Sequence, residues 1–135
     1  MTLKFMTAAV LALTLPGMAA AARPSLREVP EIENALFAVA IADAVRDHCT
    51  SIDARLFRAM NFLQQIKARA NELGYSDAEI RAHVESHDEK ARMRAKGTAY
   101  LAAHGVQMGD PESFCVFGRA EIARNSAIGA LLRAR

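Results

Sequence analysis

The sequence has little of what marks several large classes of protein. Its 135 residues contain two cysteines and no tryptophan, and 17 lysines and arginines nearly balance 15 aspartates and glutamates. Two cysteines cannot supply the four thiolates of a zinc or iron–sulfur site within one chain. A net charge of +2 lacks the basic excess typical of a nucleic-acid-binding domain. No apolar run reaches the ~20 residues that a membrane-spanning helix needs.

The motifs of common catalytic families are missing as well. The sequence has no G-x-S-x-G, no glycine-rich phosphate loop, no H-E-x-x-H and no C-x-x-C-H haem signature. A general acid would need a second, positioned group beside it, and the sequence singles out no such pair. We therefore expect no catalytic residue, no bound cofactor and a protein that is not an enzyme.

The first 22 residues are typical of a secretory signal peptide. Lys4 supplies positive charge, residues 5–15 form an uncharged apolar segment, and four alanines at 19–22 offer a cleavage site. The alternative is a membrane anchor, but this apolar segment would span only about half of a bilayer core. The sequence thus predicts export to the periplasm and a mature chain without a transmembrane segment.

Cys49 and Cys115 are expected to form a disulfide, because an exported chain meets an oxidising compartment. The alternative is a pair of buried free thiols. A redox-active pair is disfavoured, since such pairs usually occur as C-x-x-C and these cysteines are far apart in the sequence. Alanine provides 21 of the residues after the leader, which leaves a small core that a disulfide would help to stabilise.

Residues 31–135 are expected to form one compact all-α domain, after an extended lead-in over residues 23–30 that contains two prolines. Apolar residues recur at the spacing of amphipathic helices, without convincing strand alternation. Ser76-Asp77-Ala78-Glu79 is a capping box, and Asp110-Pro111 is an N-cap followed by proline at the first helical position. The pattern predicts four helices, over about residues 31–49, 51–73, 77–104 and 111–133.

A binding face is predicted from apolar residues that lie outside the main apolar stripe of their helix. The first helix is apolar on two nearly opposite sides, and the second side includes Phe37 and Ile41. Such a helix is either central in the bundle or part of a partner interface. The second helix has a clean apolar stripe that includes Leu56, Met60 and Leu63 and is expected to face the core, whereas Phe57 falls outside it. We therefore consider Phe37, Ile41 and Phe57 as candidate binding residues.

The sequence contains one spacing that suits a metal ion. His83 and His87 are four residues apart, which on a continuous helix puts two imidazoles on adjacent turns of one face, able to chelate Zn, Cu or Ni. The alternative is structural, because His87 falls among apolar positions, between Val84 and Ala91, while His83 falls at the solvent margin. His83 and His87 are thus the candidate metal ligands.

The helix expected over residues 111–133 carries polar residues near its apolar face. Glu121 and Asn125 are one turn apart there, and a buried carboxylate needs a partner. One interpretation is a structural pair with an arginine, such as Arg55 or Arg94. The other is a polar hot spot within a binding groove.

Two glycines lie on the same predicted helix, at positions 118 and 129. Each glycine costs about 1 kcal/mol in helix propensity, so a packing reason is expected for keeping it. The spacing predicts that another helix approaches closely at Gly118 and Gly129.

Several motifs spread over nearly the whole mature chain support a resemblance: Gly74-Tyr75-Ser76-Asp77-Ala78-Glu79-Ile80, Glu89-Lys90-Ala91-Arg92-Met93-Arg94, Ala99-Tyr100-Leu101, Phe114-Cys115 with Gly118 and Ile122, and Ser126-Ala127-Ile128-Gly129-Ala130-Leu131-Leu132-Arg133. In these motifs the chain resembles a small family of uncharacterised exported proteins of Rhodobacter-type alphaproteobacteria. Its members are often encoded among the genes for respiratory complex I, and some are labelled as a subunit of that NADH dehydrogenase.

The resemblance implies no activity and no site residues. An iron–sulfur subunit would need four cysteine ligands and an interior location, whereas this chain has two cysteines and a predicted export signal. At most, the resemblance implies an accessory or neighbour role on the outer side of the inner membrane. We expect a non-enzymatic periplasmic interaction protein that binds an envelope protein or a second copy of itself. The alternative is a periplasmic metal-binding protein that uses His83 and His87.

Overall fold

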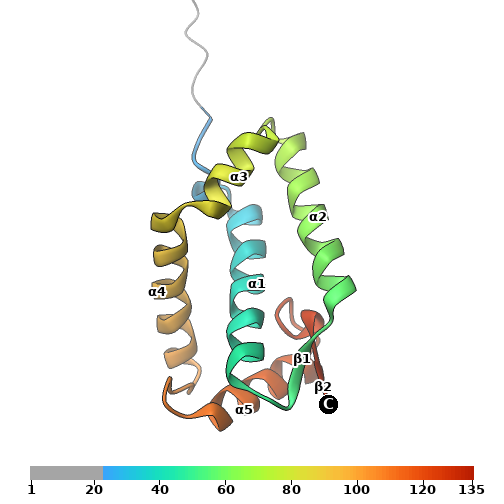
Figure 1. Ribbon diagram of the computed structural model, residues 1–135, viewed down its shortest axis with the longest axis vertical. Helices are drawn as coiled ribbons and strands as arrows, with labels where there is room; N and C mark the ends of the chain where they lie inside the picture. Colours follow the sequence, from blue (N-terminus) through green and yellow to red (C-terminus); the bar gives the residue numbers. More distant parts are fainter. Residues whose placement is uncertain (1–22) are drawn as a thin grey trace, which may run out of the picture.

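The computed structural model describes residues 23–135, so the expected signal peptide over residues 1–22 lies outside the described residues (Figure 1). The described chain is mostly helical, which confirms the all-α expectation in outline. None of its helices combines the length and the apolar character needed to cross a membrane. In chain order, its elements are η1 (Leu26–Glu28), α1 (Pro30–His48), β1 (Ile52–Ala54), α2 (Leu56–Glu72), α3 (Asp77–Glu85), α4 (His87–Ala103), α5 (Pro111–Ala123), η2 (Gly129–Leu131) and β2 (Leu132–Ala134).

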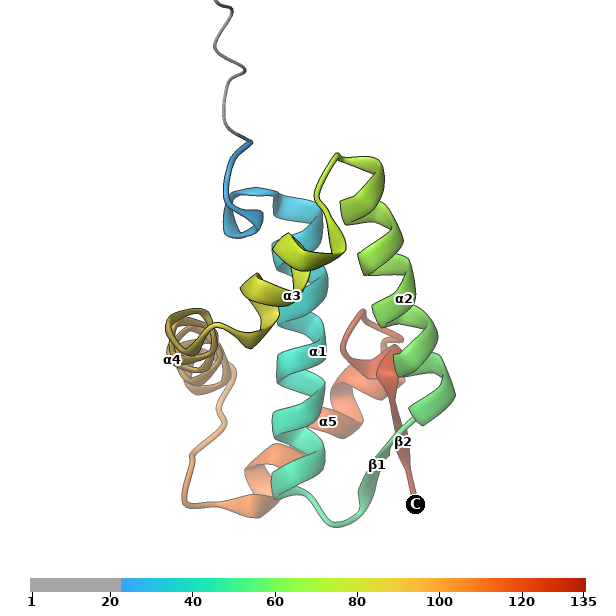
Figure 2. The ribbon, with the colours of Figure 1, turned by 45° about the horizontal axis from the view of Figure 1, so that its top comes forward.

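Helix α1 runs through the middle of the molecule. It lies between α4 and α2, and α5 crosses near its C-terminal end (Figures 1 and 2). Proline at its first position suits a helix start, because the missing N–H has no partner within the helix there. Its buried residues face several directions: Ile32, Glu33, Ala38, Ile41, Ala42 and Val45. Of the two interpretations of its apolar sides, the central helix is the one that the structure shows.

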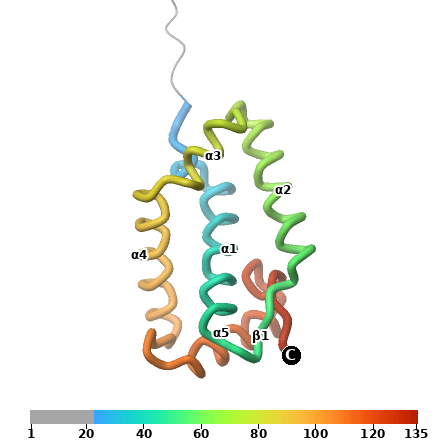
Figure 3. The backbone as a smooth tube through the Cα atoms, viewed as in Figure 1, coloured from blue at the N-terminus to red at the C-terminus, as the bar shows by residue number. Residues whose placement is uncertain are grey.

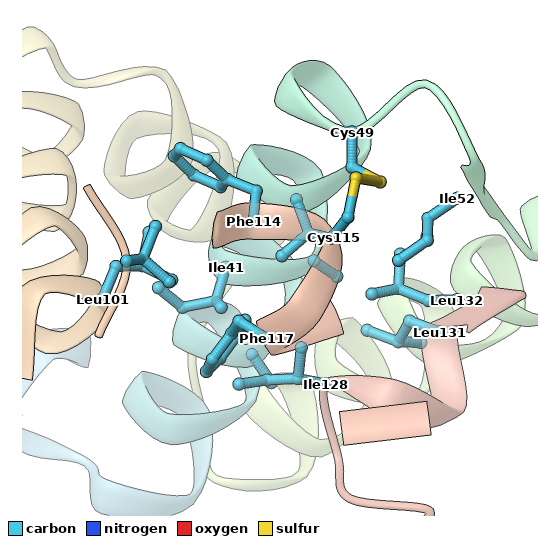
Figure 4. Close-up of a cluster of buried hydrophobic side chains, with 14 residues drawn as sticks. Ile41, Cys49, Ile52, Leu101, Phe114, Cys115, Phe117, Ile128, Leu131 and Leu132 are labelled. Atoms are coloured by element: carbon cyan, nitrogen blue, oxygen red, sulfur yellow. A yellow bond between two sulfur atoms is a disulfide. The ribbon is translucent and has the colours of Figure 1, made fainter. Parts of the chain in front are cut away.

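The buried side chains form two clusters at opposite ends of α1. The larger cluster joins the C-terminal half of α1 to β1, α4, α5, η2 and β2 (Figure 4). The smaller one joins η1, the start of α1, the end of α2 and Tyr75. The hydroxyl of Tyr75 donates a hydrogen bond to the Pro24 carbonyl at 2.6 Å. Figure 3 shows the lead-in at the same end of the molecule as α3 and the turn between α2 and α3. The lead-in therefore packs against the domain and includes the 3-10 helix η1.

The predicted disulfide is confirmed. Cys49 follows α1 and Cys115 lies on α5, and their sulfur atoms are 2.08 Å apart (Figure 4). Gly118 lies one turn further along α5, where an added Cβ would come within 2.7 Å of the Val45 side chain and 2.6 Å of the Ile52 side chain. The predicted close approach at Gly118 is thus correct, and α1 and β1 are the elements that approach.

The helix predicted over residues 51–73 begins later than expected. Residues 52–54 form β1, which pairs antiparallel with β2, and α2 starts only at Leu56. In addition, Arg135 binds Asp53 through two hydrogen bonds, at 2.8 and 2.7 Å. This ion pair lowers the pKa of Asp53, chiefly through the hydrogen bonds from Arg135. The C-terminal segment is thereby joined to the connection between α1 and α2.

The helix predicted over residues 77–104 is two helices that meet at Ser86. The capping box at Ser76 and Glu79 is present as predicted and starts α3. Ser86 has an extended backbone conformation, and its hydroxyl accepts a hydrogen bond from the Glu89 amide at 3.3 Å, which caps α4. A serine N-cap stabilises a new helix start in this way. Helix α4 therefore changes direction relative to α3, as Figure 2 shows.

The helix predicted over residues 111–133 ends ten residues early, at Ala123. Asn125 adopts a positive φ of 48°, a left-handed conformation that asparagine tolerates and that ends helices. The chain then folds back as η2 and β2. Gly129 thus lies in η2, where an added Cβ would come within 2.0 Å of the Glu121 carbonyl oxygen. Its close neighbour is the backbone of α5, so the predicted packing against another helix is wrong here.

Candidate functional site

Four large apolar side chains on the N-terminal half of α2 are exposed to solvent, and we call them the α2 surface. The exposed fractions are 64% for Leu56, 83% for Phe57, 54% for Met60 and 42% for Leu63. Isolated exposed apolar residues are ordinary, but four within two turns of one helix form a continuous feature. Such patches on soluble proteins usually mark interaction sites.

The exposure follows from the way in which α2 is held. Its inner side buries Ile66 and Ala70 against α1 and the lead-in. Toward its N-terminus, α2 leans away from α1 and faces the C-terminal segment instead (Figures 1 and 2). The apolar sector of α2 is wider than the surfaces that cover it. The expectation that Leu56, Met60 and Leu63 line the core is therefore wrong, whereas the prediction that Phe57 lies outside the buried stripe is confirmed.

The other two candidate binding residues belong to the packing of α1 against α4. Ile41 is 1% exposed and lies in the main cluster, so it offers no surface to a partner. Phe37 is half-buried and contacts the Tyr100 ring edge-on, with ring centroids 5.2 Å apart. The ammonium of Lys96 lies 4.5 Å from the centre of the Phe37 ring. Of the three predicted binding residues, only Phe57 is largely exposed to solvent.

The two candidate metal ligands lie on different helices. His83 is in the last turn of α3 and His87 is the first residue of α4, so the continuous helix behind the four-residue spacing is absent. The expected burial is also reversed, because His87 is exposed and His83 is half-buried. The Nε2 atom of His83 lies 4.0 Å from the Glu89 carboxylate. Within residues 23–135, no group of three or more His, Cys, Asp or Glu side chains is arranged to hold a metal ion.

Glu121 is buried, and its partners are local. Arg124 and Ser126 both hydrogen-bond to its carboxylate. The sequence suggested Arg55 or Arg94 as partner, and both suggestions are wrong because the chain turns back directly after α5. Asn125 is exposed in that turn and shares no helix face with Glu121. The structural interpretation of Glu121 is therefore the one that the structure supports, since its contacts fix the turn.

The most connected polar cluster is one that the sequence analysis missed. Glu33 on α1 is buried and accepts hydrogen bonds from Arg92 and Lys96 on α4. Arg92 also contacts Glu89, and Glu89 in turn binds Arg27 of the lead-in. The hydrogen bonds from Arg92 are the main cause that lowers the pKa of Glu33. The sequence signal that could have revealed this cluster is Glu33 itself, a carboxylate within the apolar pattern of the first helix.

The comparison with known protein families identifies the chain. The model of a family of unknown function (DUF5333) matches residues 24–133, which is nearly all of the described domain. The chain belongs to this family. No curated protein and no solved structure matches it. The family description assigns no activity to its members.

Proposed function

We propose that this DUF5333 protein is an exported, non-catalytic interaction module that binds an envelope protein through the α2 surface. The observation that carries the proposal is the exposure of Phe57 in one patch with Leu56, Met60 and Leu63. A large aromatic side chain ringed by other apolar groups is the usual anchor of a protein–protein interface. The rigid helix beneath it presents these groups in a fixed arrangement, which lowers the entropy cost of binding.

The charges on α2 favour an unlike partner over a second copy. Two cations lie at the α2 surface, since Arg58 is on the exposed N-terminal half of α2 and Arg55 directly precedes the helix; neither forms an ion pair with any residue of the described chain. Further along the helix, Lys67 and Arg69 are already paired with carboxylates. Two α2 surfaces facing each other would bring like charges together, which disfavours association. The partner surface that complements α2 is therefore apolar at its centre and acidic at its rim.

Two features support an envelope location for this interaction. The predicted signal peptide directs export, and a disulfide such as Cys49–Cys115 persists in an oxidising compartment. The resemblance to exported proteins encoded among complex I genes suggests where to look for the partner. Proteins on the outer side of the inner membrane, near the respiratory chain, are the first candidates.

Site-directed photo-crosslinking in the native cells tests the proposal. A photoreactive residue at position 60 should give a discrete adduct with one acidic envelope protein, whereas the same probe at Ala82, exposed on α3, should not. The adduct should disappear in Phe57→Asp, which adds a charge at an exposed position without removing a core contact. Failure to obtain a position-specific adduct, or an adduct that survives Phe57→Asp, would refute the proposal.

The same experiment separates the alternatives. An adduct of twice the chain mass would show self-association and contradict the unlike partner. Labelling by lipid alone would show a membrane surface in place of a protein. Metal binding by His83 and His87 remains a second proposal, and the contact between His83 and Glu89 is the observation that favours it.

A further inference from the structure

A groove of about 430 Å³ lies between α1 and α4, on a different side of α1 from α2. Its floor consists of buried apolar groups from three helices: Ile41 on α1, Leu101 on α4 and Phe114 on α5. Figure 4 shows these three side chains close to one another on the α4 side of the main cluster. The volume falls in the range of pockets that bind small organic molecules.

Small residues on the facing helices create the groove. Ala40 and Ala44 line it from α1, and Gly97 lines it from α4. Gly97 is buried so close to α1 that an added Cβ would lie 3.4 Å from the Ile41 side chain. Met93 and Met108 flank the opening, and flexible thioethers of this kind adapt to apolar ligands of varied shape.

The two walls of the groove differ in how far their charged side chains are ion-paired. On the α1 wall, Asp43 and Asp47 both bind Arg46, at 2.7 and 2.8 Å. On the α4 wall, Lys90 and Arg94 are exposed and form no ion pair with any residue of the described chain. Because two carboxylates share one arginine on the α1 wall, one negative charge there stands against two unpaired positive charges on the α4 wall. The unpaired positive charge is therefore in excess, and it lies beside an apolar floor.

His48 forms the end of the groove near α5. Its ring stacks on the Phe114 ring, with centroids 4.2 Å apart and the planes 8° from parallel. The Nδ1 atom of His48 is 2.8 Å from the Ala44 carbonyl oxygen, and because a carbonyl only accepts, Nδ1 carries the proton. The stacked, hydrogen-bonded ring therefore gives the groove a flat wall of fixed orientation at this end.

We propose that this groove binds an amphipathic anion, a free organic carboxylate with an unbranched apolar chain. The chain would lie on Ile41, Leu101 and Phe114, and the carboxylate would pair with Lys90 and Arg94. Burial of methylene groups supplies most of the affinity, and the two cations select the sign of the head group. This ligand site is independent of the α2 surface and goes beyond the proposed partner interaction.

Calorimetry with decanoate as the probe tests the inference. Monomeric decanoate should bind once per chain, while decyltrimethylammonium, with the same chain and the opposite charge, should bind at least about tenfold more weakly. Lys90→Ala/Arg94→Ala should weaken decanoate binding by about tenfold or more. The matched control Lys67→Ala/Arg81→Ala removes the same charge outside the groove and should leave the binding unchanged.

A second variant tests the apolar part of the site. Thr98 lines the groove at an exposed position, so Thr98→Phe should fill the opening, abolish binding and leave the fold intact. The inference would be overturned by absent decanoate binding, by equal binding of the cationic probe, or by binding that survives both variants. Binding lost in Met60→Asp would place the ligand on the α2 surface, and binding only to phosphatidylglycerol vesicles would indicate a membrane surface; either result would also overturn it.

Discussion

Arg92 on α4 donates two hydrogen bonds to the Glu33 carboxylate on α1, from Nη1 to Oε1 at 2.9 Å and from Nη2 to Oε2 at 3.0 Å. Lys96 donates a third at 3.0 Å, and the Glu33 side chain is only 8% exposed. Helix α4 buries few apolar residues of its own, namely Gly97 and Leu101. Its attachment to α1 therefore depends strongly on this carboxylate.

Glu33→Gln should lower the free energy of unfolding at pH 7 by about 2 kcal/mol, less than for a fully buried pair because Arg92 and Lys96 reach solvent. The pKa of Glu33 in the folded protein lies below its ordinary value of 4.5. The stabilisation is thus fully present above pH 4.5 and is lost as the pH falls through the folded-state pKa. Urea unfolding between pH 3 and 7, about the range in which carboxylates titrate, measures both effects.

The control for this prediction is Glu72→Gln, which removes an exposed carboxylate paired with Arg69. An exposed pair contributes about 0–1 kcal/mol, so this variant should keep the stability and the acid sensitivity of the parent. If Glu33→Gln and the parent lose stability identically as the pH falls, the role assigned to Glu33 is wrong.

Gly118→Ala should destabilise the protein. The new Cβ would overlap the side chains of Val45 and Ile52, both buried in the main cluster. Overpacking costs about 1–3 kcal/mol, whereas replacing glycine by alanine gains about 1 kcal/mol in helix propensity. The cost of overpacking is therefore the larger of the two over most of its range. Gly109→Ala, in the turn before α5, is the control for packing, because an added Cβ there meets no atom within 4 Å. Thermal unfolding should show a lower Tm for Gly118→Ala only, and equal Tm values would contradict the close packing.

Removal of the disulfide should cost roughly 4 kcal/mol, because the bond closes a loop of 66 residues in the unfolded chain. Urea unfolding of Cys49→Ser/Cys115→Ser against the oxidised parent measures the loss. The intact mass of the parent should rise by about 2 Da on reduction. A purified, exported chain with two free thiols would show that the bond does not form in the cell.

Metal binding predicts a stoichiometric calorimetric response to Zn, Cu or Ni that is lost in His87→Ala. Because Glu89 lies 4.0 Å from His83, Glu89→Gln should weaken the same response. His104→Ala is the control, since the His104 ring packs on Tyr100 at a centroid distance of 4.1 Å, at the other end of α4 from His87. No heat with any of the three ions, or equal heat in His87→Ala, would exclude the His83/His87 site.

Apolar periodicity and local caps predict the helix starts correctly where a cap or a proline within one turn determines the start. The N-termini at Ser76 and Pro111 were read correctly because a side-chain oxygen or a proline acts within one turn of the chain. The break at Ser86 carried the same Ser-x-x-Glu pattern, with Glu89 three residues later. The sequence does not reveal this break, because the apolar spacing continues across it. In a capping box the Glu89 carboxylate would accept a hydrogen bond from the Ser86 amide, but here it binds Arg27 and Arg92.

Other features depend on contacts between distant segments. A strand of three residues such as β1 is too short for alternation to reveal, and its partner β2 lies at the other end of the domain. The α2 surface was hidden for a related reason, because Met60 and Leu63 fit a buried stripe by spacing alone. Which part of a wide apolar sector is covered depends on where α1 and η2 lie, and the sequence pattern holds no such information.

The pairing of β1 with β2 has a consequence for how the chain reaches its native state. Asp53 and Arg135 are 82 residues apart, and the main cluster needs Leu131 and Leu132 from the same late segment. During synthesis, the part of α1 that packs against η2 stays uncovered until that segment emerges. Contacts over such long separations slow folding relative to a simple helical bundle. The domain should therefore close only after its last residues are free to pair with β1, when nearly the whole chain has been made.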